Sequence, residues 1–490
     1  MRTLLVLACA HVWVLAAEAA GTESQVGKTD QFSDLPPGLR TVLQQTEPLP
    51  YPRGNRLPLF ILPIQDSLRH LNDSQTDSAL EALSRRGIAY TTSWNPAQSD
   101  ESLGEGLRIA RQATRHRLPT AVDATRCIDG FFDGSPETLH IDAAGKAFPD
   151  LSFDPNRKMG CPLAVLGRVP AMRKRIEFFL RGYAAGNVAV DFVFADWEID
   201  GPLEWNDAWA HSKRCERCRA GLQGLDDFRL FQQQIRRIRS QLQREVLAEP
   251  VRALFPQALV GNYGVYPHNG YRYWDDYYEQ LPAGAPFVTD QAARYREWAN
   301  EFAPCGYTMA MPVVYTWASI YQWYNFAETD YRWFYNGLLV GSNAGQHTPA
   351  HVPLVTFVHH AITVPPPNAL QTMKPFAPGR YQALLWHLLL RGHDAFFLWC
   401  LLEELEEETR LVHQVYAASL AYRDFLENGQ PVAFDIPKAP STVISGLQLN
   451  HRVLALRTDF GSRAGPVEVK LPGGTLKVPP ADRPQILDVR

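Results

Sequence analysis

The stretch Val188-Ala-Val-Asp-Phe-Val-Phe-Ala-Asp-Trp-Glu-Ile-Asp-Gly-Pro202 organises the rest of the chain. Its first half, up to Ala195, is mostly apolar and rich in β-branched and aromatic residues, which predicts a buried strand. The run ends in three acids at alternate positions, which are Asp196, Glu198 and Asp200. Because successive strand side chains point to opposite faces, Asp196 and Glu198 point the same way. Two carboxylates that leave a buried strand together are costly unless they line a polar cleft.

Seven further strand-like runs lie on either side of this stretch, with helical or long segments between them. The eight strand candidates are residues 57–64, 87–94, 118–122, 188–195, 258–263, 307–315, 352–360 and 394–399. Helices are predicted over residues 77–86, 103–116, 169–185, 225–247 and 381–390. This alternation predicts an α/β fold with a parallel sheet and crossover helices. Eight units indicate a TIM-like (β/α)8 barrel, in which the chemistry lies at the carboxyl ends of the strands.

The length and composition fit one barrel with an appendage. The chain has 490 residues, of which 46% are apolar, enough for a large core. The barrel is predicted over residues 56–428. Short alternating runs separated by Gly and Pro then predict a small antiparallel β domain over residues 429–490. The net charge of −4 gives no electrostatic case for a nucleic-acid partner.

The N-terminus has the features of a secretory signal peptide, predicted over residues 1–20. A charged Arg2 precedes an apolar run that is shorter than the roughly 20 residues a membrane anchor needs. Residues 21–55 are polar and rich in proline, which predicts a linker or a wrapping arm. No later segment is long and apolar enough to span a bilayer, so we expect a secreted or periplasmic protein with no integral membrane segment after signal cleavage.

Six cysteines follow the signal peptide, and an even number in an exported protein permits disulfides. Cys215-Glu-Arg-Cys218 has the sharpest spacing, which suits a tight disulfide or half of a zinc site. No second CxxC or HxxxH completes a metal set. The sequence therefore favours disulfides or free thiols over zinc, and no metal or cofactor is predicted.

Aromatic and polar residues follow several of the predicted strands. The candidates for substrate binding are Trp94, Asp123, Asp200, Asn262, Tyr263, Tyr266 and Trp399. Tyr315 ends the sixth strand and is a candidate catalytic residue. Tyr and Trp rings stack on the apolar faces of sugars, while acids and amides bind hydroxyl groups. The pattern favours an oligosaccharide or polysaccharide as substrate.

Glycoside hydrolysis ordinarily uses two carboxyl groups, although some enzymes use the substrate's own acetamido group as the nucleophile. The seventh predicted strand contains neither Asp nor Glu. Only the pair at the fourth strand is therefore needed, with Glu198 as general acid and Asp196 orienting an N-acetyl group. Close carboxylates raise one another's pKa, so one of them stays protonated near neutral pH.

Four alternatives remain open. The pair Asp196 and Glu198 could be a salt-bridged rim that closes the barrel. A protein nucleophile, Asp200 or Glu403, would serve sugars without acetamido groups. A non-catalytic barrel would keep the aromatic residues and bind glycans without turnover. A metal-dependent hydrolase would use Asp123, Asp196, Asp200 and His359.

The acidic run from Glu403 to Glu408 is interpreted as the solvated start of a helix.

Asp196-Trp-Glu198 resembles the Asp-x-Glu pair of hyaluronidases and, more loosely, that of chitinase-like and hexosaminidase barrels. Three further segments resemble the hyaluronidases, namely residues 261–267, 312–315 and 397–399. The resemblance implies that Glu198 is the acid/base and that Asp196 supports the acetamido group. It also implies that Tyr315 assists the reacting centre and that Trp399 forms the wall of the sugar subsite. We therefore expect an exported glycoside hydrolase acting on a glycan that contains N-acetylhexosamine, with retention of configuration.

Overall fold

The computed structural model describes residues 32–128, 133–154, 157–197, 208–268, 299–318, 321, 324, 326–363, 373–461, 465–471 and 473–490. The predicted signal peptide lies outside these residues, as do Glu198 and Asp200. Within the part of the chain described, no helix has both the length and the apolar character to cross a membrane.

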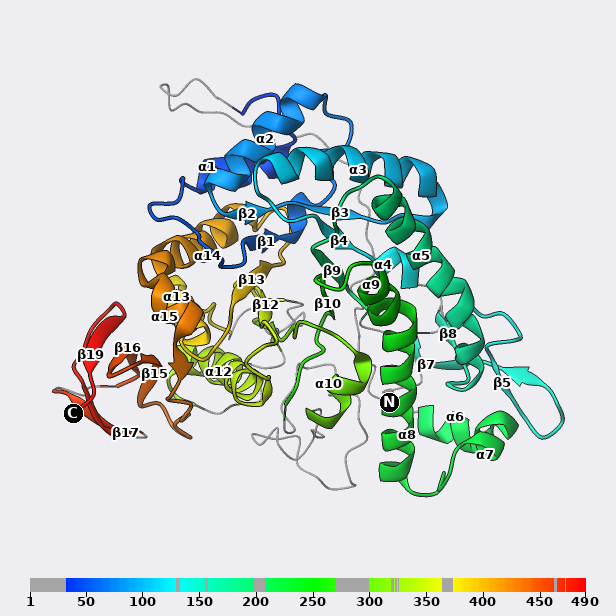
Figure 1. The fold of residues 1–490 in the computed structure, drawn as a ribbon. Coiled ribbons are helices and arrows are strands. Elements are labelled where there is room, and N and C mark those ends of the chain that lie inside the picture. The colour runs from blue at the N-terminus through cyan, green and yellow to red at the C-terminus, as the bar shows by residue number, and fades with distance from the viewer. Residues whose placement is uncertain are drawn as a thin grey trace.

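Short parallel strands occupy the centre of the molecule (Figure 1). They are β1 (Leu59–Ile61), β2 (Ile88–Ala89), β3 (Thr91–Ser93), β4 (Ala121–Asp123), β9 (Phe192–Ala195), β10 (Leu259–Asn262), β11 (Val313–Val314), β12 (Val355–Val358) and β13 (Ala395–Leu398). Two sheets result, with the strand orders β11-β12-β13-β1-β2 and β10-β9-β4-β3. All eight predicted strands are present, and the predicted strand 87–94 is divided into β2 and β3.

The two sheets meet at two seams. At the first seam the chain runs directly from β2 to β3 through Tyr90. At the second seam the backbone N–H groups of Thr308 and Met309 donate to the carbonyl oxygen of Val260, at 2.9 and 3.2 Å. Among the described strands no ladder closes the ring. The arrangement fits a TIM-type barrel, but the strands that the structure describes do not form the single closed sheet expected from the sequence.

Helices cover the outside of the parallel strands (Figure 1). The long ones are α2 (Asp73–Arg85), α3 (Ser99–Arg115), α5 (Val169–Ala185), α8 (Phe228–Gln243), α12 (Thr329–His347), α13 (Pro378–Leu389) and α14 (Leu405–Ser419). Shorter ones are α4 (Thr125–Ile128), α9 (Glu249–Leu254), α10 (Ala299–Cys305) and α15 (Arg423–Asn428). Helix α5 has the predicted bounds because Ile176, Phe179, Leu180 and Tyr183 form one buried stripe.

The segment predicted as a linker or wrapping arm contains a further helix, α1 (Pro37–Gln45). Its residues Leu39, Val42 and Leu43 are fully buried, and α1 packs against α14. This part of the arm therefore belongs to the hydrophobic core.

The C-terminal region forms antiparallel sheets, in agreement with the alternating sequence pattern. One sheet has the order β14 (Gln430–Pro431), β15 (Thr442–Leu449), β16 (Arg452–Asp459) and β19 (Gln485–Asp488). A separate hairpin consists of β17 (Val467–Leu471) and β18 (Gly474–Val478). The strand β19 was not predicted from the sequence.

A fully buried arginine connects the parallel part of the molecule to the C-terminal sheet. Arg391 follows α13, and it donates to Ser445 Oγ at 2.7 Å and to the carbonyl oxygens of Phe434 and Asp435 at 2.8 and 3.1 Å. Burial lowers the pKa of Arg391 to about 9. The polar acceptors offset the cost of placing this cation in the core.

Another buried residue, His393, makes the stability of the fold depend on pH. Its Nε2 lies 3.0 Å from the carbonyl oxygen of Gly341, and its Nδ1 contacts the hydroxyl of Thr356. Burial lowers the pKa of His393 to about 4. The unfolded value is about 6.5, so the unfolded chain binds the additional proton. This contribution to stability is complete above pH 6.5 and is lost as the pH falls toward 4.

When the pH falls from 7 to 5, the free energy of unfolding should drop by about 2 kcal/mol more in the wild type than in the His393→Asn variant. Denaturant unfolding at a series of pH values measures the difference. The exposed His351 provides a control, since His351→Asn should leave the pH dependence unchanged. Equal pH dependence in the wild type and His393→Asn would contradict the assignment.

Candidate functional site

The carboxyl ends of the central strands meet at one rim, because neighbouring strands within each sheet are parallel. In the register, Ala195 of β9 pairs with Asn262 of β10, and Val358 of β12 pairs with Leu398 of β13. The residues that follow these strands therefore emerge together. They include four of interest, namely Asp196, Tyr263, His359 and Trp399.

Hydrogen bonds to neighbouring strand ends hold the backbone at Asp196. Its N–H donates to Thr125 Oγ1 at 2.7 Å. The next residue, Trp197, donates its N–H to Asn262 Oδ1 at 2.9 Å, and Asn262 Nδ2 donates to Trp197 O at 3.3 Å. Asn262 is fully buried. It therefore fixes the main chain of the acidic stretch.

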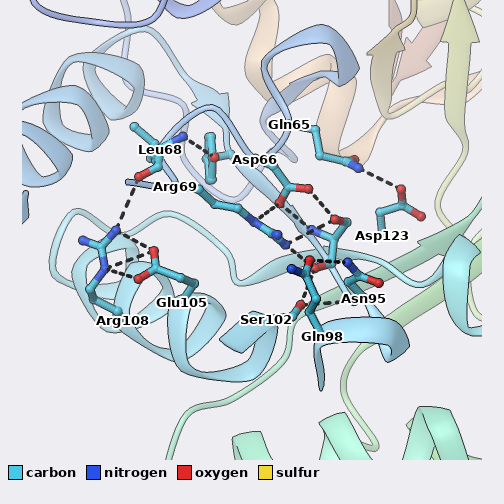
Figure 2. A network of polar contacts seen from close by, with 12 residues as sticks. Gln65, Asp66, Leu68, Arg69, Asn95, Gln98, Ser102, Glu105, Arg108 and Asp123 are labelled. Atoms are coloured by element: carbon cyan, nitrogen blue, oxygen red, sulfur yellow. Dashed lines mark hydrogen bonds and ion pairs between the residues drawn. The ribbon is translucent and has the colours of Figure 1, made fainter. Parts of the chain in front are cut away.

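Asp123 lies at the end of the adjacent strand and shares a partner with Asp196. Its Oδ1 accepts hydrogen bonds from the N–H and the hydroxyl of Thr125 at 2.8 and 2.5 Å. Its Oδ2 accepts one from Gln65 Nε2 at 2.9 Å (Figure 2). Burial raises the pKa of Asp123, while these hydrogen bonds act in the opposite direction. Thr125 thus couples the two acidic strand ends through one side chain.

A polar network extends from Gln65 along the turn that follows β1 (Figure 2). Asp66 Oδ1 accepts a hydrogen bond from Ser93 N at 2.9 Å and lies 3.1 Å from Arg69 Nε. Arg69 Nη2 donates to the carbonyl oxygen of Ser93 at 2.9 Å. These contacts hold the ends of β1 and β3 together beside Asp123.

Two aromatic residues predicted to bind substrate are in the core instead. Trp94 is 1% exposed, and its ring stacks on Phe179 of α5 with centroids 5.2 Å apart. Tyr266 is fully buried, and its ring lies 5.0 Å from that of His268. Trp94 therefore belongs to the layer between strands and helices.

Three other predicted aromatic residues come together at the rim. The rings of Tyr315 and Trp399 are stacked, with centroids 5.4 Å apart and an interplanar angle of 21°. The ring of Tyr263 lies 6.1 Å from that of Tyr315. Trp399 is partly exposed, whereas Tyr263 and Tyr315 are 4% and 7% exposed. We call Tyr263, Tyr315 and Trp399 the aromatic cluster.

A buried glutamate that the sequence reading missed supports this cluster. Glu408 Oε1 accepts hydrogen bonds from the backbone N–H groups of His360 and Ala361, both at 2.7 Å, and lies 3.0 Å from His359 Nδ1. The His359 ring meets Trp399 edge to face, with centroids 5.0 Å apart. Glu408 is 1% exposed, which corrects its interpretation as part of a solvated helix start. Its spacing from Leu405 and Val412 on the buried face of α14 is the signal that could have found it.

No protein-family model matches this sequence, and no curated protein matches it. Several solved structures have a similar chain course. The GH36 alpha-galactosidase AgaA from Geobacillus stearothermophilus, in complex with stachyose, is 10% identical over 89% of this chain and 52% of that chain, with a TM-score of 0.41. The isomaltulose synthase SmuA from Protaminobacter rubrum is 10% identical over 86% of this chain and 95% of that chain, with a TM-score of 0.38.

Bee venom hyaluronidase is also among the similar structures. It is 12% identical over 60% of this chain and 83% of that chain, with a TM-score of 0.32. Its name is that of the family that the Asp196-Trp-Glu198 segment resembles.

The six described cysteines are buried, and no disulfide joins them. They are Cys127, Cys161, Cys215, Cys218, Cys305 and Cys400. Of the two states that the sequence favours, disulfides and thiols, the structure has thiols at these six positions. Among the side chains that the structure describes, Asp123, Asp196 and His359 form no group with metal-ligand spacing.

Proposed function

We propose that the chain is an exported glycoside hydrolase that acts on a glycan containing N-acetylhexosamine. Glu198 is the general acid and base, and Asp196 assists the acetamido group of the substrate. Tyr315 assists the reacting centre, while Trp399 and Tyr263 contact the sugar. Asp123 and Asp200 are proposed to bind hydroxyl groups.

One observation carries the proposal. Asp196 follows β9 at the same rim at which β10, β11 and β13 present the aromatic cluster. The N–H of Tyr263 donates to the carbonyl oxygen of Ala195 at 2.9 Å, so the acidic stretch and the cluster are adjacent along the rim. An acid beside stacked aromatic rings is the combination that sugar recognition requires, because rings cover apolar faces and carboxylates bind hydroxyl groups.

The burial and the hydrogen bonds of Glu408 favour a mechanism in which the substrate's acetamido group, and not a protein carboxylate, is the nucleophile. The segment 352–362, around β12, contains no Asp or Glu of its own. Two carboxylates reach the end of β12: Glu404 Oε2 lies 3.8 Å from His359 Nε2, and Glu408 lies 3.0 Å from His359 Nδ1 with two backbone N–H groups on its Oε1. Glu408 is also 1% exposed, so it is poorly placed to attack an anomeric carbon. The substrate's own carbonyl oxygen then supplies the nucleophile.

In the proposed reaction Glu198 donates a proton to the glycosidic oxygen as its bond to the anomeric carbon breaks. The acetamido carbonyl oxygen bonds to that carbon from the opposite face and forms a cyclic oxazolinium ion, while Asp196 stabilises the positive charge on the acetamido nitrogen. Glu198 then removes a proton from water, which opens the ring. Two inversions at the anomeric carbon give net retention.

Aryl glycosides with and without acetamido groups test the substrate class, together with a thiazoline analogue of N-acetylglucosamine. We expect turnover on N-acetylhexosaminides and competitive inhibition by the thiazoline, because it mimics the cyclic intermediate. Turnover without thiazoline inhibition would indicate a protein nucleophile such as Asp200 or Glu403. Glycan binding without turnover on any substrate would indicate a non-catalytic barrel. Either result would overturn the proposal.

A further inference from the structure

Two excursions from the rim lie side by side at the edge of the molecule (Figure 1). The first follows β4 and contains the strands β5 (His140–Ile141), β6 (Ala147–Phe148), β7 (Asp150–Asp154) and β8 (Arg157–Met159). The second follows β9 and contains α6 (Ala208–Arg214) and α7 (Glu216–Gly221). Both excursions therefore begin at the strands that carry Asp123 and Asp196.

Four side chains with metal-binding atoms converge where the excursions meet. They are His140, Cys161, Cys215 and Cys218, and their ligand atoms all lie within 4.8 Å of one another. The first excursion contributes His140 and Cys161, and the second contributes the CxxC pair. All four side chains are buried. The structure thus supplies the second pair of ligands that the sequence spacing did not reveal.

The imidazole of His140 is an independent indication of a ligand. The residue is fully buried, and apart from the Cys215 thiol neither of its ring nitrogens has a hydrogen-bond partner in the described structure. Its ring is fixed by stacking on Phe148, with centroids 5.2 Å apart. A buried imidazole with only a thiol for a partner is costly, and a metal ion bound between the two would satisfy both groups.

The sulfur positions fit metal ligation better than a disulfide. Cys161 Sγ and Cys218 Sγ are 3.5 Å apart, and both residues are free thiols. A zinc tetrahedron with Zn–S bonds of about 2.3 Å has edges of about 3.8 Å. A disulfide between any two of the three cysteines would leave the third sulfur and the imidazole of His140 buried without a function.

The backbone holds the four ligands in place. Cys215 immediately precedes α7, and its carbonyl oxygen accepts a hydrogen bond from Arg219 N at 2.9 Å. Cys161 N donates to the carbonyl oxygen of Thr138 at 2.8 Å. Arg217 Nη1 of α7 donates to the carbonyl oxygen of Leu139 at 3.0 Å, beside His140. The bond between Arg217 and Leu139 joins the two excursions beside the cluster, and the other two hold the ligands within their own excursion.

We propose that His140, Cys161, Cys215 and Cys218 bind one structural zinc ion that joins the two excursions. Three sulfurs and one nitrogen complete a tetrahedron and leave no position for water, which is typical of a structural site. Binding releases the thiol protons to solvent, and no oxidant is needed. The ion would fix the loops that follow β4 and β9 without taking part in the reaction at Asp196.

Metal content tests this proposal directly. The full chain is purified in reducing buffer with Zn2+, and weakly bound metal is then removed. Elemental mass spectrometry is expected to find about one zinc per chain. The variants Cys218→Ser and His140→Ala should retain far less. Cys127→Ala replaces a buried cysteine outside the cluster and should retain about one zinc, which makes it the matched control.

Cobalt substitution in the wild-type chain tests the metal site even if a ligand variant fails to fold. The wild-type chain loaded with Co2+ is expected to show thiolate-to-cobalt charge-transfer bands and the intense visible bands of tetrahedral cobalt. A wild-type chain that retains neither zinc nor a cobalt spectrum would overturn the proposal. So would a Cys161–Cys218 disulfide found by peptide mapping in freshly purified protein, or a Cys218→Ser variant with a full complement of zinc.

Discussion

Glu198→Gln is expected to lower kcat by about a thousandfold while leaving the fold unchanged, because the amide cannot protonate the glycosidic oxygen. The backbone beside it is held by Asn262 through the main chain of Trp197, so the substitution removes no contact of that clamp. Steady-state kinetics on the best N-acetylhexosaminide measure the effect. Circular dichroism and thermal unfolding check that the fold is retained.

Asp191→Asn is the matched control for this experiment. Asp191 is an exposed acid just before β9, and its Oδ2 accepts a hydrogen bond from Thr120 N at 2.8 Å. It lies at the amino end of the strand, away from the rim, so its variant should retain the wild-type kcat. Wild-type turnover in Glu198→Gln would remove the acid/base assignment altogether.

Glu408→Ala is expected to lower the free energy of unfolding by about 2–5 kcal/mol, because two buried backbone N–H groups lose their acceptor. These are the N–H groups of His360 and Ala361, at the end of β12. The substitution also removes the carboxylate that lies 3.0 Å from His359 Nδ1. Since His359 packs against Trp399, turnover should fall together with stability.

The neighbouring Glu407 separates the effect of burial from that of charge. Glu407 is exposed on the same helix, and its carboxylate lies 3.6 Å from Arg410 Nη2. Glu407→Ala should change the unfolding free energy by no more than about 0.5 kcal/mol. Chemical denaturation of both variants gives the comparison, and equal losses would show that Glu408 makes no special contribution.

Much of the fold follows from local sequence pattern. The predicted bounds of α5 agree with the structure because one face of this helix is buried and the other is solvated. Helix α12 lacks such a contrast and was missed. Its Tyr331 and Phe334 both contact Phe460 after β16, while its Gly337 lies against Val314 and Leu384. A helix buried on several sides has no polar face for the sequence to reveal.

The sequence predicts only part of the candidate site, for a different reason. Residues at strand ends can be named from the pattern, and this brought Tyr263, Tyr315 and Trp399 together correctly. The pattern does not say which way the chain turns after the last ladder bond, and Trp94 was therefore misplaced.

Partners from distant segments are a second limit on what the sequence reveals. Glu408 meets His359 across 49 positions, and His140 meets Cys218 across 78. No local periodicity records such pairs, because folding alone brings them together.

The hydrogen bonds of Arg391 bear on the modularity of this chain. A chain cut after the last helix would retain the guanidinium and lose the acceptors on Ser445, Phe434 and Asp435. It would also uncover the side of Tyr331 and Phe334 that packs on Phe460. The C-terminal sheet therefore supplies buried polar and aromatic partners to the parallel part of the chain, and a chain without it is expected to be less stable.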